Sequence, residues 1–152
     1  MSKNIMLIIT LILIIIAGVL IWRLFFYLPP ANFVKIKIKD VDYKIEIAKT
    51  SAQKIKGLSS RNHLCSNCGM IFIFGFESDL PFWMKDTLIP LDLIWLNKNG
   101  QVVDIQTANE INSQKIYHNQ SPAQYVIELN ASDSQKINLK IGDIIDISKI
   151  ND

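Results

Sequence analysis

Residues 82–95 carry one lysine and two aspartates among aromatic and aliphatic residues of the kind that fill protein cores. Asp92 lies in the run 91–96, where hydrophobic residues occupy both faces of an extended segment. Glu128 lies in a similar run, 125–129. A buried carboxylate costs several kcal/mol unless it takes up a proton or meets hydrogen-bond donors. We therefore expect both carboxylates to need partners, which predicts a polar cluster inside a hydrophobic domain.

The partners that the sequence offers for these carboxylates are Lys85, Arg61 and the hydroxyl of Thr87. Aromatic side chains close to the same runs could form the wall of a pocket above a polar floor. A few convergent polar groups on an aromatic surface are typical of small-molecule sites. The candidate ligand-binding site, or polar cluster, contains six residues: Trp83, Lys85, Thr87, Asp92, Tyr125 and Glu128.

Three interpretations of this cluster are open. The first is a polar network that fixes strand register and binds no ligand. The second is a small-ligand pocket with the lysine and the two carboxylates at its floor and Trp83 or Tyr125 on its wall. The third is a hydrolase-like enzyme in which Asp92 and Glu128 act as acid and base and Lys85 stabilises charge. We assign no catalytic residue, because strand context alone does not fix the distance between two carboxylates.

Cys65 and Cys68 form a C-x-x-C motif, preceded by His63. A disulfide between them would stiffen a loop outside the cytoplasm, although it closes only a small ring. A thioredoxin-like site would need a helix after the first cysteine, whereas the residues after the motif are typical of a strand. A zinc site would need a fourth ligand, and His118 is the only other histidine. We expect a disulfide, or a reduced pair without a role, and no metal or cofactor.

Three stretches of the chain, 69–74, 82–95 and 125–130, resemble one protein family. Their most specific motifs are Phe-Trp-Met-Lys in the second stretch and Tyr-Val-Ile-Glu-Leu-Asn in the third. On these motifs the chain is similar to the domain of unknown function 192 (DUF192) family. The resemblance implies a small β-rich domain, often exported or lipid-tethered, with no established activity. The chain departs from the family pattern at Ser59, where methionine is usual, and at Asp86, where asparagine is common.

The segments that would position these residues are mostly strands. Alternating residues at 33–39 and 43–47 predict a β-hairpin with a lysine-rich outer face. Further strands, rich in aromatic and β-branched residues, are predicted at 70–74, 82–85, 91–96, 101–106, 125–129 and 139–147, the last of them broken at Gly142 and Asp143. Thr50 or Ser51 can cap a short helix that ends before Gly57. The pattern predicts a mostly β (α+β) fold, a compact β-rich barrel or sandwich with one short helix.

The N-terminus carries an uncharged hydrophobic run at residues 5–22. At about 1.5 Å per residue, a helix of this length nearly crosses a hydrocarbon core of about 30 Å, and a snorkelling Arg23 would extend it. The alternative is a cleaved signal peptide, whose hydrophobic region is normally shorter. We expect a single-pass N-terminal transmembrane helix that contacts the membrane through residues 5–28. It lies in an anchor region, 1–30, before a globular domain, 31–152.

The side of the membrane and the charge of the domain bear on its partners. Basic residues are more numerous after the span than before it, which argues for a cytoplasmic domain. The very short leader argues for export of the residues after the span, and we expect an extracytoplasmic domain. The chain has 16 basic and 14 acidic residues, and leaving out Lys3 and Arg23 gives 14 of each in the domain. This balance gives no reason to expect a nucleic-acid partner.

The leading hypothesis is a membrane-anchored, extracytoplasmic accessory module that binds a small ligand or an envelope partner. The alternatives are the hydrolase-like enzyme and a purely structural accessory domain. An enzyme is not favoured, because the sequence lacks the Gly-x-Ser-x-Gly, phosphate-loop and His-Glu-x-x-His motifs. Both the binding hypothesis and the enzyme hypothesis expect Lys85, Asp92 and Glu128 to converge on an open cleft, and dispersal or burial of the three would contradict both in this form.

Overall fold

The computed structural model describes residues 3–26 and 31–150 of the chain. Internal contacts divide the chain into two units, Met1–Pro30 and Ala31–Asp152. The described part of the first unit is one helix, α1 (Lys3–Phe26), of 24 residues. At 1.5 Å per residue its length is about 36 Å.

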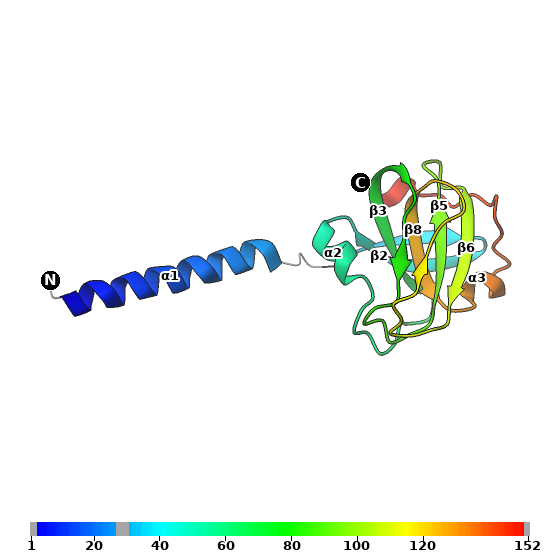
Figure 1. Ribbon diagram of the computed structural model, residues 1–152. Helices are drawn as coiled ribbons and strands as arrows, with labels where there is room; N and C mark the ends of the chain where they lie inside the picture. Colours follow the sequence, from blue (N-terminus) through cyan, green and yellow to red (C-terminus); the bar gives the residue numbers. More distant parts are fainter. Residues whose placement is uncertain (1–2, 27–30, 151–152) are drawn as a thin grey trace. The chain divides into compact units, whose positions relative to one another are not determined.

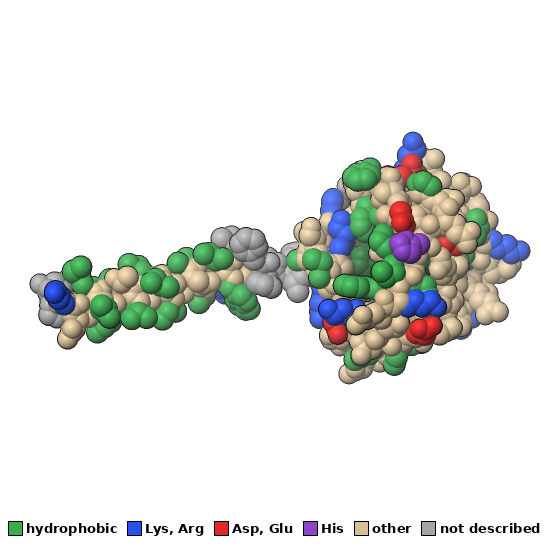
Figure 2. Space-filling model, viewed as in Figure 1, with side chains coloured by type: hydrophobic (Ala, Val, Ile, Leu, Met, Phe, Trp, Pro, Cys, Tyr) green, Lys and Arg blue, Asp and Glu red, His purple; other side chains and the backbone are tan. Residues whose placement is uncertain are grey.

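Helix α1 is long and hydrophobic enough, over Lys3–Arg23, to cross a membrane. Hydrophobic side chains cover it along its length (Figure 2). A signal sequence near the N-terminus has the same length and hydrophobic composition. The helix is therefore a candidate for either a membrane span or a cleaved signal sequence. The part of the predicted span after residue 26 and the two prolines beyond it lie outside the described residues.

The second unit is built on one mixed sheet of six strands in the order β1-β2-β3-β8-β5-β6 (Figure 1). Its strands are β1 (Asn32–Ile38), β2 (Val41–Ala48), β3 (Cys68–Ser78), β5 (Leu91–Leu96), β6 (Val102–Ala108) and β8 (Ala123–Asn130). A separate pair is formed by β4 (Phe82–Trp83) and β7 (Ile116–Tyr117). The predicted hairpin and four further predicted strands are therefore present in the large sheet, and a fifth lies in the separate pair, which confirms the β-rich fold class.

Strands β2 and β3 are the one parallel pair among these neighbours, and a crossover containing helix α2 (Ser51–Lys56) joins them. Thr50 caps this helix: its Oγ1 accepts from Gln53 N at 3.2 Å, and Gln53 Oε1 accepts from Thr50 N at 2.9 Å. This reciprocal pair satisfies amide groups that a helix start leaves open. Gly57 ends the helix with a positive φ of 44°. The predicted short helix is confirmed with its cap.

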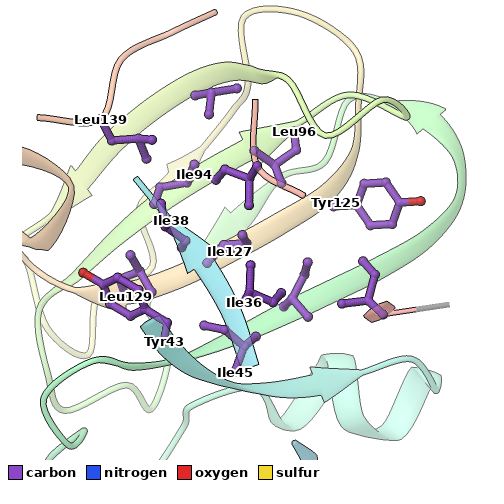
Figure 3. Packing of buried hydrophobic residues seen from close by; sticks show 14 residues of the cluster. Ile36, Ile38, Tyr43, Ile45, Ile94, Leu96, Tyr125, Ile127, Leu129 and Leu139 are labelled. Carbon is purple, nitrogen blue, oxygen red and sulfur yellow. The ribbon is translucent and has the colours of Figure 1, made fainter. Parts of the chain in front are cut away.

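Hydrophobic side chains fill both faces of the sheet. One cluster joins Ile38 on edge strand β1 to Val102 on the opposite edge strand, β6. Figure 3 shows Ile38 and Ile127, from β1 and β8, in this shared interior. Lys39, directly after β1, pairs with Asp143 at 2.7 Å, and Val102 N on β6 donates to the Asp143 carbonyl at 2.8 Å. Because the two edges approach each other in this way, the sheet is curled into an open barrel. A second cluster covers the other face around Trp95, whose Nε1 donates to the carbonyl of Leu80 at 3.0 Å.

The C-terminal segment differs from the prediction. Residues 139–147, predicted as a strand, form only one isolated bridge, between Gln101 and Ile144. Gly142 has a φ of 96° in this segment, so the chain turns instead of extending alongside β6. The structure also contains two further one-turn helices, α3 (Asp133–Lys136) and η1 (Ser148–Ile150).

Candidate functional site

The two predicted carboxylates lie on opposite faces of the large sheet. In the antiparallel pair of β5 and β8, Asp92 is opposite Leu129, and Leu93 is opposite Glu128. Residues directly opposite each other share a face, and successive residues of a strand alternate between faces. Asp92 therefore points to the barrel interior, whereas Glu128 points to the outer cluster. The hypothesis that they form an acid–base pair is wrong, because the sheet separates them.

Asp92 is a fully buried carboxylate that holds the segment leading into α3. Its two oxygens accept from Ser134 N at 2.8 Å, Ser134 Oγ at 2.6 Å, Ser132 N at 3.1 Å and Thr107 Oγ1 at 2.7 Å. Four donors satisfy the charge, as a buried carboxylate requires. The expectation of converging donors is therefore met by amides and hydroxyls of Thr107, Ser132 and Ser134.

Tyr125 lies on the same face as Asp92. It is opposite Leu96 in the register and is 5% exposed within the interior cluster (Figure 3). Its neighbour Val126 is the residue that shares the face of Glu128. Neither Tyr125 nor Asp92 lines the pocket on the outer face of the sheet, so the structure removes these two from the predicted group of six.

The other four predicted residues line a single pocket of about 260 Å³ on this outer face. Its polar members are Lys54, Lys56, Ser59, Lys85, Thr87 and Glu128. Its aromatic members are Phe72, Phe74, Phe82 and Trp83. The pocket thus lies between helix α2, strand β3 and the segment after β4.

Glu128 has the most unusual environment in the pocket. The residue is 5% exposed, and its Oε2 atom is buried without a hydrogen-bond partner, alone in this respect among the described side chains. Burial raises the pKa of this carboxyl from 4.5 to about 8, against a smaller lowering by the charge of Arg61. Arg61 itself is paired with Glu46 at 2.7 Å. Glu128 is therefore a neutral acid near pH 7, and it can both donate and accept a hydrogen bond.

A tight turn after β4 brings two of the predicted residues to the pocket. Thr87 N donates to the carbonyl of Met84 at 3.1 Å, and Asp86 between them has a φ of 57°. Left-handed backbone is tolerated best by glycine, asparagine and aspartate. Asp86 can therefore occupy a position where the family that the sequence resembles commonly has asparagine. The turn leaves Lys85 exposed at the rim and buries Thr87 in the wall.

Two lysines of the pocket lie against its aromatic rings. Lys85 Nζ is 5.5 Å from the ring centroid of Trp83, and Lys54 Nζ is 4.4 Å from that of Phe74. Lys54 Nζ also donates to the carbonyl of Ile73 at 2.9 Å, which fixes its position. Ammonium groups within about 6 Å of a ring face are attracted to it. The rim of the pocket is therefore positively charged and aromatic.

The prediction missed several residues of the pocket and one of its neighbours. Phe72 and Phe74 follow Met70 at two-residue spacing, and Met70 is opposite Glu128 in the register, so all share one face. Lys54 comes from α2. Glu46 is beside Met70 on β2 and neutralises Arg61, the cation predicted to serve Glu128 or Asp92. The period-two pattern of β3 could have revealed the phenylalanines once its pairing with β8 was known.

The cysteine pair and the histidines lie outside this pocket. Cys65 and Cys68 form a disulfide that joins the loop before β3 to the first residue of that strand. Asn130 Nδ2 donates to the carbonyl of Cys65 at 3.1 Å, which ties this loop to the end of β8. His118 contacts Asp79 at 3.0 Å on the surface. Within residues 3–26 and 31–150, no group of three metal-binding side chains converges.

Comparisons with known proteins place the fold. The chain matches the DUF192 family, described as an uncharacterized ACR, over residues 34–147. It is 30% identical over 103 residues to a UPF0127 protein from Thermococcus gammatolerans, covering 66% of this chain and 64% of that protein. A UPF0127 protein from Thermococcus kodakarensis is 27% identical over 104 residues, with coverage of 67% and 63%. The chain therefore spans less than two thirds of the length of these relatives.

Two solved structures share the fold. One is a proposed transcription regulator from Sinorhizobium meliloti 1021, with a TM-score of 0.70, 28% identity, and coverage of 76% of this chain and 92% of that one. The other is a protein of unknown function from Novosphingobium aromaticivorans DSM 12444, with a TM-score of 0.68, 28% identity and coverage of 76% and 84%. Neither name states a ligand.

Proposed function

Because the chain belongs to the DUF192 family, whose description assigns no activity, we propose its function from its pocket. The domain is a binding module, tethered to a membrane by α1, and it takes a small molecule over Glu128. The observation that carries this proposal is that the buried carboxyl with the orphaned oxygen belongs to a residue that lines a pocket. An unpaired buried polar group costs about 1–3 kcal/mol, and a ligand that hydrogen-bonds to it recovers this cost.

The contrast between the two carboxylates supports binding over a structural role. Asp92 shows what a structural carboxylate of this fold looks like, since four donors surround it. Glu128 has no such set, although Thr87 and Lys85 line the same pocket. If Glu128 served only to stabilise the sheet, a hydrophobic residue of similar size would stabilise the folded protein more.

The geometry gives less support to an enzyme. General acid–base catalysis by a carboxyl group normally works with a second titratable group placed across the reacting bond. In the described pocket Glu128 is the one carboxyl group, and its partner in the sequence-based hypothesis, Asp92, lies behind the sheet. The lysines are held against aromatic rings rather than against the carboxyl.

Titration of the full chain in neutral detergent with indole tests ligand binding. Indole is a neutral aromatic probe small enough for the pocket. We expect saturable shifts of the indole N–H resonance of Trp83, assigned with a Trp83→Phe variant. Phe74→Ala, which opens the wall, should weaken binding, whereas Tyr125→Phe on the opposite face should leave it unchanged. A Trp83 resonance that does not move, or a response that Tyr125→Phe alters and Phe74→Ala does not, contradicts the proposal.

An extracytoplasmic location is part of the same proposal. The disulfide between Cys65 and Cys68 supports it, because structural disulfides persist mainly in oxidising compartments. A periplasmic reporter enzyme fused after Asp152 should be active and should sediment with membranes. Activity of a cytoplasm-only reporter at that position would contradict the location, and a soluble fusion would identify α1 as a cleaved leader.

A further inference from the structure

We propose that the pocket over Glu128 selects small organic anions that have an aromatic or aliphatic body and a carboxylate, phosphate or similar group at one end. This inference rests on the proposed function and names the chemical class of the ligand. The anionic end would lie between Lys54 and Lys85 at the rim, and the hydrophobic body would lie against Phe82 and Trp83.

The charges that line the pocket favour an anion. Three lysines contribute to the lining, Lys54, Lys56 and Lys85, and Glu128 is the one acidic residue among the described lining residues. Opposite charges attract each other more strongly at the lower effective dielectric of a protein surface than in bulk water. A ligand anion at the rim therefore gains from each lysine it approaches.

The rings of the pocket are unfavourable for a cationic ligand. Aromatic pockets often bind ammonium groups through their ring faces. Here the Nζ atoms of Lys54 and Lys85 already lie 4.4 Å and 5.5 Å from the centroids of Phe74 and Trp83. A cationic ligand would have to displace these ammonium groups or accept their repulsion. The pocket's own cations thus occupy the positions that an amine would use.

The floor of the pocket is compatible with an anion as well. Glu128 is buried, and the charged group that acts on it most is Arg61, which is already paired with Glu46. A neutral carboxyl does not repel a ligand anion, and its O–H can donate to an oxygen of the ligand. The buried hydroxyl of Thr87 lines the same pocket and supplies a second donor or acceptor.

The walls set the shape of the ligand body. Phe82 packs edge-to-face on Phe72 with ring centroids 4.9 Å apart, which makes a rigid aromatic wall. Phe82 and Trp83 also line a second hollow of about 230 Å³ with Ile116. A body longer than one ring system can therefore continue past Trp83, whose side chain is more than half exposed. The ligand is amphiphilic, with its charged end beside the lysines.

A matched set of three indole compounds tests the charge preference on the full chain in neutral detergent. Indole-3-acetate is anionic, indole-3-acetamide is its neutral counterpart, and tryptamine is cationic. We expect dissociation constants, measured on the Trp83 resonance with empty micelles as a blank, to rise from the acetate to the acetamide to tryptamine. The dissociation constants of acetate and acetamide should differ by roughly 10-fold, since each of two charge-assisted contacts at a partly exposed rim should change the affinity by roughly 3- to 5-fold.

Lysine variants show whether the rim causes the preference. Lys54→Gln and Lys85→Gln should each weaken indole-3-acetate binding by roughly 3- to 5-fold and leave the acetamide unchanged. Lys35→Gln, on the outer face of β1, is the matched control and should change neither. Unfolding curves of the three variants verify that each is folded.

Two short-chain lipids identify the source of the anion. If dihexanoylphosphatidylglycerol displaces indole-3-acetate and dihexanoylphosphatidylcholine does not, the result supports the proposal with a lipid head group as the ligand. Failure of both lipids, with binding of the acetate, supports it with a soluble organic acid as ligand. Equal binding of acetate and acetamide, or preferred binding of tryptamine, overturns the charge inference and leaves the binding function intact. If none of the three indole compounds moves the Trp83 resonance, both are overturned.

Discussion

Replacement of Glu128 by glutamine should make the domain more stable at alkaline pH. Removal of a buried carboxylate that has hydrogen-bond partners would have the opposite effect. The folded protein holds a proton on this carboxyl up to about pH 8, whereas the unfolded chain releases it near pH 4.5. Between these two values the folded state binds one proton more than the unfolded state. The wild-type free energy of unfolding therefore falls as pH rises through this window.

The size of this effect follows from the pKa difference. One pKa unit corresponds to about 1.4 kcal/mol, so the wild type loses up to about 5 kcal/mol between pH 4.5 and about 8 through this group. The glutamine variant has no such loss. Near pH 5 we expect it to be within about 1 kcal/mol of the wild type, since one neutral hydrogen-bonding group replaces another. By about pH 8 it should be more stable by several kcal/mol.

Urea unfolding of the full chain in neutral detergent, followed by near-ultraviolet circular dichroism, measures the difference at a series of pH values. The pKa of Asp143 is lowered by hydrogen bonds from Lys39 and the Lys140 amide, and its contribution is the same in both proteins and cancels. A difference that stays constant from about pH 5 to about pH 8 would refute the reasoning. It would mean that Glu128 ionises normally and that water or a partner reaches its Oε2 atom in the folded state.

Three further perturbations test the structural side of the account. Asp92→Asn places an amide donor against the Ser134 amide, and it should cost about 2–4 kcal/mol, measured by urea unfolding at pH 7, without changing indole binding. Gly69→Ala would bring a Cβ within 2.5 Å of a β8 carbonyl, and it should cost about 3 kcal/mol or more in the same assay. Replacement of Cys65 and Cys68 by serine should lower stability by about 2 kcal/mol, because the closed loop is short, while the ligand affinities stay the same.

The sequence predicted local structure better than it predicted the site. Strand β5 has the predicted bounds, since a short run of branched and aromatic residues is a local signal. The helix before Gly57 and its cap were predictable for the same reason. The separation of Asp92 from Glu128 was not, because it depends on the register between two strands far apart in the chain. A shift of one residue in that register would put both carboxylates on one face.

The sequence analysis missed several pocket residues for the same reason. Lys54 reaches the pocket from α2, and the pairing of β3 with β8 brings Phe74 to it, so long-range packing decides both. The sequence indicated that Glu128 would need a partner or a proton, and burial supports the proton. Arg61, the cation expected beside Glu128, forms an ion pair with Glu46 instead. The sequence around Glu46 did not indicate this pair.

A crystal structure of the full chain with indole-3-acetate tests the central claim most directly. We expect the indole ring against Phe82 and Trp83, and the carboxylate about 3 Å from the Nζ atoms of Lys54 and Lys85. A ligand bound elsewhere would contradict the claim. So would an empty pocket in which a protein side chain hydrogen-bonds to Oε2 of Glu128.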